Sequence, residues 1–316
     1  MLSDNAKSYL HLHFIVFIWG FTAIMGALIT LDALPLVWFR MIIGAAVIGL
    51  YAVAVKVKIK VSRKLLIQFL AAGIIIALHW FTFFKAIKLS NVSTTLACLS
   101  TGAFFTSLLE WIFYRKKIIY YEIFFGLIVV ASLCIIFYQQ DPYFFTVLLS
   151  IFKGENYAVE GAANYPLGVL TALLSASLSA LFAIINGNFA KQHDAVTVSF
   201  YELLGGIGFF ALCLLFTGSF NRNFFIISGS DWLWLFILGT ICTGYAAVAS
   251  VKIMKFLSPY TVMLTINLEP IYGIILAVIV FNDQEKMSIS FYIGAAVIIT
   301  TVIINGILKN KRKIEN

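Results

Sequence analysis

Ten long apolar stretches, separated by short polar segments, make up almost the whole chain of 316 residues. A helix needs about 20 mostly apolar residues to cross the roughly 30 Å hydrocarbon core of a membrane. Continuous apolar runs predict helices, because the strands of a membrane barrel alternate between apolar and polar positions. The predicted spans lie near residues 10–31, 34–55, 66–87, 90–113, 119–138, 167–190, 195–217, 232–254, 258–281 and 288–308. We therefore expect an all-α integral membrane protein with ten transmembrane helices.

The second half of the chain repeats features of the first. At a spacing of 168 residues, these positions correspond: Leu89-Ser90 with Leu257-Ser258, Phe104 with Tyr272, and Gly126 with Gly294. At a spacing of 161 residues, segment 37–44 corresponds to segment 198–205. Each half contains five spans, so the second half enters the membrane upside down relative to the first. We expect two inverted five-helix repeats, at 1–138 and 167–316, with an inserted loop at 139–166.

Inverted repeats are typical of secondary transporters, whose substrate sites lie near the membrane midplane between the repeats. An intramembrane serine protease would need a Gly-x-Ser-x-Gly sequence, and a metalloprotease His-Glu-x-x-His; neither sequence occurs. A receptor or scaffold would ordinarily carry a soluble domain or a long tail, and only eight residues follow Leu308. We expect a transporter that is not an enzyme and has no cofactor. An intramembrane enzyme, or a receptor or scaffold without transport activity, is the alternative.

Composition and charge agree with a membrane protein. Hydrophobic residues make up 62% of the chain and charged residues 11%, which excludes an ordinary soluble domain, where about 25% are charged. If the N-terminus is cytoplasmic, the cytoplasmic segments carry 16 lysines and arginines and the opposite segments carry 5. This distribution predicts that both termini are cytoplasmic. The net charge of +8 therefore reflects topology and contact with anionic headgroups, and we expect no nucleic-acid partner.

The four cysteines and the inserted loop are expected to be structural. All four cysteines fall inside predicted spans, where thiols usually pack as small hydrophobes, and their spacing suggests no metal site. The apolar part of the loop, residues 143–152, is too short to span and predicts a re-entrant or interfacial segment. The loop could act as a lid or be a passive surface insertion.

Several local patterns resemble the EamA-type members of the drug/metabolite transporter superfamily. The residues that carry the resemblance are Trp19-Gly20, Pro35 followed by Arg40, Leu257-Ser258-Pro259, Leu268-Glu269-Pro270, the turn Phe281-Asn282-Asp283-Gln284-Glu285, and Gly294. Two positions differ from the family pattern: Thr101-Gly102 stands where a Glu-Pro pair or a proline is common, and Tyr114-Arg115-Lys116 where a Gly-Glu turn is common. The resemblance covers the chain except 139–166. It implies a carrier of the bacterial cytoplasmic (inner) membrane, commonly an exporter of amino acids or other small metabolites.

Charged side chains at membrane depth usually face a wet cavity or the bundle interior, because burial in hydrocarbon costs a few kcal/mol or more. Glu269 lies about 11 residues into its span, and Pro270 disturbs the helix beside it. We expect Glu269 to bind substrate or a proton, with interhelical hydrogen bonding as the alternative. Arg40 and Glu202 are expected to act as gating or structural charges, in an ion pair or near a helix end.

His79 could relay a proton, because histidine titrates near neutral pH, although a neutral structural histidine is more common. Trp80 and Phe83 could form an aromatic wall beside it. Small and hydroxylated residues at helical spacing mark several spans and favour a central cavity. The substrate-binding residues predicted from these patterns are Trp19, Thr22, His79, Trp80, Phe83, Thr101, Ser179, Asn186, Thr243, Thr265, Glu269 and Tyr272. Spans 5 and 10 are almost wholly apolar and are expected at the periphery or at a homodimer contact.

Overall fold

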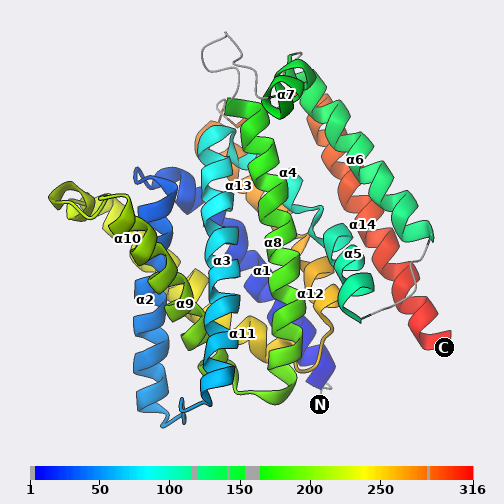
Figure 1. The fold of residues 1–316 in the computed structure, drawn as a ribbon. Coiled ribbons are helices and arrows are strands. Elements are labelled where there is room, and N and C mark those ends of the chain that lie inside the picture. The colour runs from blue at the N-terminus through cyan, green and yellow to red at the C-terminus, as the bar shows by residue number, and fades with distance from the viewer. Residues whose placement is uncertain (1–3, 115–119, 141–142, 154–163, 283–284, 316) are drawn as a thin grey trace.

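The computed structural model describes residues 4–114, 120–140, 143–153, 164–282 and 285–315, and these residues form helices without any strand (Figure 1). The protein is therefore an all-α membrane protein, as predicted. Both termini lie at the lower end of the bundle in Figure 1, which we call the lower side; the opposite end is the upper side.

The first half of the chain contains seven helices. They are α1 (Asp4–Leu28), α2 (Ala33–Ala54), α3 (Arg63–Leu89), α4 (Val92–Leu99), α5 (Gly102–Tyr114), α6 (Tyr120–Gln140) and the short α7 (Phe144–Lys153). In Figure 1, α7 sits at the upper end of the bundle between α6 and α8 (Asn164–Gln192). With ten residues, α7 is too short to span, in keeping with the interfacial segment predicted there.

The second half continues after α8 and has the same plan. Its elements are α9 (Ala195–Phe216), the 3₁₀ turn η1 (Arg222–Phe225), α10 (Gly229–Gly239), the π-helix η2 (Thr240–Tyr245), α11 (Ala246–Ile253), α12 (Pro259–Ile266), α13 (Glu269–Phe281) and α14 (Ile289–Glu315). In Figure 1, α1 starts at the lower side and α8 at the upper side, so these corresponding helices run in opposite directions.

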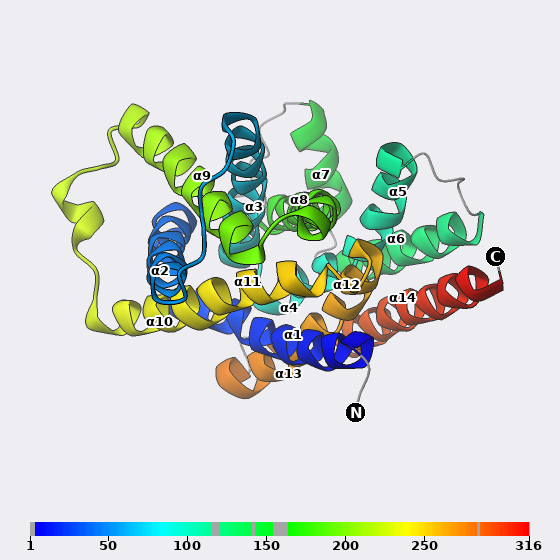
Figure 2. The ribbon, with the colours of Figure 1, turned by 90° about the horizontal axis from the view of Figure 1, so that it is seen from below.

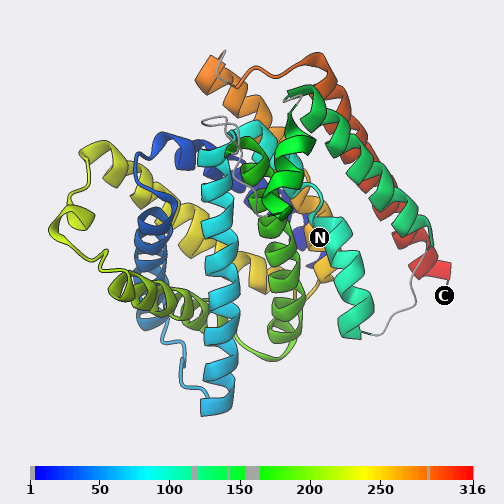
Figure 3. The ribbon, with the colours of Figure 1, turned by 45° about the horizontal axis from the view of Figure 1, so that its top comes forward.

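The described residues contain eight helical segments that are long and apolar enough to cross a membrane. Five are the single helices α1, α2, α3, α8 and α9, and the other three combine α4 with α5, α10 with η2 and α11, and α12 with α13. The apolar runs of α6 and α14 are shorter, at 124–138 and 289–305. The predicted count of ten is thus approached by eight clear spans and two shorter apolar helices, which lie side by side along one edge (Figure 3).

Helices of each half pack against helices of the other half, and corresponding helices do so in the same way. In the first half α1 packs on α13, and in the second half α8 packs on α4 and α5. Likewise α2 packs on α10 and η2, while α9 packs on α3. The corresponding helices α2 and α9 also meet, as do α6 and α14. In the view from below, α6 and α14 lie at the periphery of the bundle (Figure 2).

Two spans are broken at corresponding positions. The first break separates α4 from α5 at Ser100–Thr101, and the second separates α12 from α13 at Asn267–Leu268, 167 residues later. Pro270 explains the second break, because it has no N–H for a bond to the carbonyl four residues earlier. At the first break, Thr101 donates its hydroxyl to the Cys98 carbonyl (2.7 Å). Broken spans at membrane depth occur in transporters where the backbone lines a cavity.

Glycines bring α3 and α9 into backbone contact. A Cβ on Gly73 would lie 2.9 Å from Glu202 Cα, and a Cβ on Gly205 would lie 2.7 Å from Leu70 Cα. Both distances are shorter than real contacts, so the two helices can only approach this closely at glycine. This contact fixes the backbone of Glu202 against α3.

Candidate functional site

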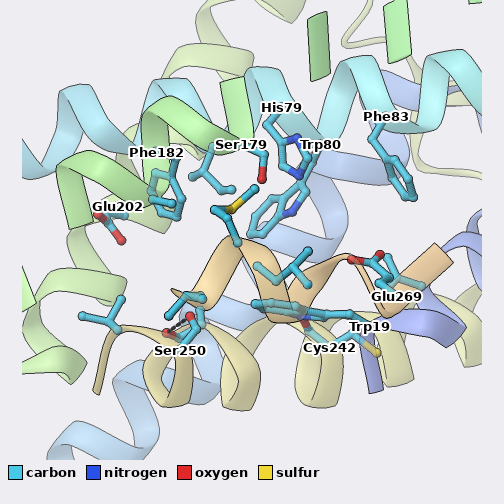
Figure 4. Close-up of a pocket in the computed structure, with 18 of the residues that line it drawn as sticks. Trp19, His79, Trp80, Phe83, Ser179, Phe182, Glu202, Cys242, Ser250 and Glu269 are labelled. Atoms are coloured by element: carbon cyan, nitrogen blue, oxygen red, sulfur yellow. Dashed lines mark hydrogen bonds between the residues drawn. The ribbon is translucent and has the colours of Figure 1, made fainter. Parts of the chain in front are cut away.

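A cavity of about 100 Å³ lies between the two halves of the bundle. It is lined mainly by α1, α3, α8, α9, α11 and α12, and by the break before α13. Its polar lining residues are Thr22, Arg40, His79, Ser179, Ser199, Glu202, Cys242, Ser250 and Glu269. The remaining lining is apolar or aromatic, including Trp19, Trp80, Phe83 and Phe182 (Figure 4).

The cavity extends toward the lower side. Arg40 and Glu269, which interact electrostatically, line the end that we call the deep end, whereas Ser250 belongs to the last turn of α11, a helix in the lower part of the bundle in Figure 1. Figure 4 shows Glu269 and Glu202 at opposite ends of the pocket. The cavity therefore has two separate carboxyl groups, one deep and one nearer the lower side.

Arg40 is a completely buried cation that forms no ion pair with any carboxylate among the residues described here. Its Nε donates to the Thr243 hydroxyl (2.9 Å), and its guanidinium lies over the ring of Trp80, 4.2 Å from the ring centroid. Its Nη1 has no hydrogen-bond partner, and the side chain is 1% exposed. Stacking on tryptophan offsets part of the cost of burying the charge, but one donor stays free for a ligand.

The π-helix η2 holds the residues around Arg40. Thr243 donates its hydroxyl to the Leu238 carbonyl five residues earlier (2.8 Å) and accepts from Arg40. The carbonyl of Cys242 accepts a bond from Trp19 Nε1 (3.2 Å). π-turns often mark functional sites, because they release backbone groups from the regular helical pattern. Here the turn holds Trp19 through the Cys242 carbonyl and Arg40 through the Thr243 hydroxyl.

Glu269 is the first residue of α13, directly after the helix break. Its side chain is 7% exposed and, among the described residues, it makes no hydrogen bond or ion pair. It interacts electrostatically with Arg40 across the cavity without touching it. The N-terminal end of a helix also favours a negative charge. The deep end of the cavity thus presents one cation and one carboxylate that face each other but leave space between them.

His79 presents a bare ring nitrogen to the cavity. Its Nδ1 lies 2.9 Å from the Ser175 carbonyl, which can only accept, so this nitrogen must carry the hydrogen. The Ser175 hydroxyl in turn donates to the His79 carbonyl (3.0 Å). This pair orients the ring and leaves Nε2 as a hydrogen-bond acceptor.

The structure brings together nine of the fourteen residues singled out from the sequence. Those that line the cavity are Trp19, Thr22, Arg40, His79, Trp80, Phe83, Ser179, Glu202 and Glu269. The other five lie outside its lining: Thr101, Asn186, Thr243, Thr265 and Tyr272. Arg40 and Glu202, expected as an ion pair or gate, form no ion pair with the residues that the structure describes. The binding roles of all these residues stay predictions.

The five residues outside the lining have other surroundings. Thr101 and Thr265 bond to carbonyls of their own helices, at 2.7 Å and 3.0 Å. The Tyr272 ring packs against Phe17, with centroids 5.5 Å apart. Thr243 lies behind Arg40, and Asn186 is fully buried beside Glu202.

Three of the polar lining residues are not among the residues predicted from the sequence: Ser199, Cys242 and Ser250. Ser199 precedes Glu202 by three residues, so helical spacing alone could have placed both on one face. Cys242 and Ser250 face the cavity only because the π-turn shifts the register of their helix, which no local sequence pattern indicates.

A sequence model of the EamA-like transporter family matches the chain twice, at residues 7–138 and 166–307. The chain belongs to this family. One solved crystal structure of a protein aligns with 98% of this chain and 99% of its own chain, with a TM-score of 0.64 and 18% sequence identity. That likeness shows a shared fold. No curated protein is significantly similar to the chain in sequence.

Side chains link the two halves at the upper side of this EamA-like transporter. Glu285, on the connection from α13 to α14, accepts bonds from the backbone N–H groups of Val92 (2.8 Å) and Ser93 (3.0 Å). It therefore caps α4 of the other half, where free N–H groups and the helix dipole favour an anion. Asp231 accepts similar bonds from the backbone and hydroxyl of Thr30, at 2.9 Å and 2.6 Å.

We expect the Glu285→Ala variant to open the upper side more often. Two charge-assisted bonds, each worth about 1.5–3 kcal/mol, would be lost, which corresponds to at least about a tenfold shift in the open population. The measurement is the labelling rate of a Ser93→Cys reporter by an impermeant thiol reagent, with the four native cysteines replaced. Ser93 is completely buried in the closed state. An unchanged labelling rate relative to the Glu285 parent would argue against a latch.

Proposed function

We propose that this protein is a secondary transporter that moves an amino acid or a closely related zwitterion across the membrane by alternating access. One observation carries the proposal: a buried cation with a free donor, Arg40, faces a buried unpaired carboxylate, Glu269, across a mostly apolar cavity. A zwitterion would satisfy both groups at once, because each of its charges needs an opposite partner. Membership of a transporter family supports the same reading.

The geometry suggests how such a substrate would be held. Its carboxylate would accept a bond from Arg40 Nη1, and its ammonium would lie against Glu269, with His79 Nε2 as a second acceptor. Charge-assisted bonds of this kind are worth about 1.5–3 kcal/mol each. An apolar side chain would rest among Trp19 and Phe83, since the cavity wall is mostly apolar there. The substrate expected is therefore an amino acid with an apolar side chain.

Alternating access fits the closed upper side and the extension of the cavity toward the lower side. In this proposal the described state is the one in which the carrier faces the lower side. The distribution of basic residues supports cytoplasmic termini, which makes the lower side the cytoplasmic side. Loading from the cytoplasm would suit an exporter in a bacterial inner membrane. Homodimer contact through α6 and α14 is the arrangement expected if the carrier is dimeric.

Counterflow in reconstituted liposomes tests the transport activity. Liposomes are loaded with one unlabelled compound, and the uptake of the same labelled compound is followed. The panel contains the amino acids, with nucleosides and small organic acids for comparison. We expect counterflow for apolar amino acids. No counterflow for any compound of the panel would contradict the proposal.

Glu269→Gln is expected to weaken amino-acid binding about ten- to hundredfold, because the ammonium group loses its charged partner. Binding of the matching carboxylic acid that lacks the amino group should change little. Both affinities are measured by competition in the counterflow assay. Equal weakening of the two ligands would show that Glu269 supports the fold rather than the ammonium. If the variant also keeps its full pH dependence, Glu269 is not on the proton path.

A further inference from the structure

The carboxyl group of Glu202 has no charged partner. It is 3% exposed, and its Oε1 makes no hydrogen bond. The helices packed against α9 carry Arg40 and His79 at the cavity. Their other charged groups are all exposed: Arg63, Lys64, Lys85, Lys88, Lys191 and Lys252. None of them acts electrostatically on Glu202. Glu269 differs in this respect, because Arg40 faces it.

Two neighbouring polar side chains are also without partners. Asn186, on α8, is completely buried and interacts with the Glu202 carboxyl, yet neither its oxygen nor its nitrogen lies in regular hydrogen-bond geometry. Ser199, one turn before Glu202 on α9, is 1% exposed with an unpartnered hydroxyl. Buried polar groups are normally paired, so three unpaired groups next to one another indicate a ligand or a change of protonation.

The chemistry of the pair favours a proton. A carboxylate only accepts, so it can take a bond from the Asn186 nitrogen but leaves the Asn186 oxygen unsatisfied. A protonated carboxyl donates to that oxygen and accepts from that nitrogen, which satisfies both side chains. A lone carboxylate at this depth would also cost several kcal/mol or more. Protonation of Glu202 therefore removes its buried charge and, at the same time, allows both hydrogen bonds with Asn186 to form.

We propose that Glu202, paired with Asn186 and assisted by Ser199, is the site that carries the coupling proton of this transporter. The proposal rests on the transport function proposed above. Glu202 and Ser199 line the cavity, so a proton that enters the cavity can reach the carboxyl. Binding takes one proton from water on one side, and release returns it to water on the other. Glu269, the proposed partner of the substrate ammonium, lies at the opposite end of the pocket from Glu202 (Figure 4), which gives the proton a place separate from the substrate.

The experiment uses the full-length protein in liposomes with the membrane potential clamped to zero and a lumen one pH unit more acidic than the medium. The probe is the labelled mixture of amino acids. For one-to-one exchange of a proton for a substrate, wild-type protein accumulates the substrate up to about tenfold in the acidic lumen, because one pH unit corresponds to a factor of ten. We expect Glu202→Gln to accumulate none and to keep counterflow. Glu110→Gln is the matched control, since Glu110 is another buried glutamate but does not line the cavity.

A second measurement needs no substrate. The infrared carbonyl band of a protonated carboxyl should be present in the wild-type protein and weaker in Glu202→Gln, and it should shift in Asn186→Leu. Accumulation that persists in Glu202→Gln, a band that is unchanged in that variant, or accumulation driven by a sodium gradient instead would overturn the proposal. Absence of counterflow in the wild type would refute the transport function alone, because the infrared band still reports on Glu202.

Discussion

Gly205→Ala is expected to destabilise the protein by about 2 kcal/mol or more and to abolish transport. The added Cβ would lie 2.7 Å from Leu70 Cα, and backbone atoms cannot move aside as a flexible side chain can. The two helices would have to separate, which also shifts Glu202, whose Cα lies against Gly73 on the same interface. Thermal unfolding in detergent and counterflow in liposomes measure the two effects.

Gly208→Ala is the matched control on the same helix. A Cβ at position 208 meets no atom within 4 Å, so the substitution adds no clash. Alanine also favours a helix over glycine by up to about 1 kcal/mol, so the stability should stay the same or rise. Equal unfolding temperatures for the two variants would show that close contact between α3 and α9 is not required.

Arg40→Gln is expected to lower the affinity for an amino acid about a hundredfold. The guanidinium is the cation at the deep end, and both its free Nη1 and its charge would be lost. Arg40→Lys should recover only part of the affinity, because lysine cannot donate to Thr243 and the substrate while stacking on Trp80 in the same planar manner. Affinities come from competition in the counterflow assay.

A substrate without its carboxylate distinguishes binding from folding. The amine that corresponds to the amino acid should bind Arg40→Gln as well as it binds the wild type, or better, because the repelling cation is gone. If the variant loses the amine and the amino acid equally, Arg40 supports the structure and does not hold the carboxylate. Glu269→Gln should show the opposite preference, with weaker binding of ligands that carry the ammonium group and little change for the acid that lacks it. The two variants together assign both ends of the substrate.

The sequence predicts most of the architecture, because membrane spans are specified by length and apolarity alone. The repeat was visible in pairs such as Leu89-Ser90 and Leu257-Ser258, and the family model matches both halves. The helix break before Glu269 was suggested by Pro270. The corresponding break at Ser100–Thr101 has no proline, so a continuous span was expected there.

The functional site was less predictable from the sequence, because it depends on which faces of distant helices pack against one another. Nine of the residues predicted from charges at membrane depth, from His79 and its aromatic neighbours, and from polar stripes at helical spacing line the cavity. The partners of buried charges could not be predicted: Arg40 lies over Trp80 without an ion pair, and Glu202 lies beside the amide of Asn186. Such pairings are set by contacts between helices far apart in the sequence.

The π-turn at Thr240–Tyr245 contains one residue more than a regular helical turn would need. One additional residue turns the rest of the helix by about 100°. The stretch from Gly229 to Ile253 therefore shows one stripe of side chains above the turn and a different stripe below it, so that Cys242 and Ser250 can both face the cavity. The corresponding helix of the first half, α3, has no such turn. After duplication of an ancestral half, insertion of one residue in the second copy would be enough to make the third span of each half present a different set of side chains to the shared cavity.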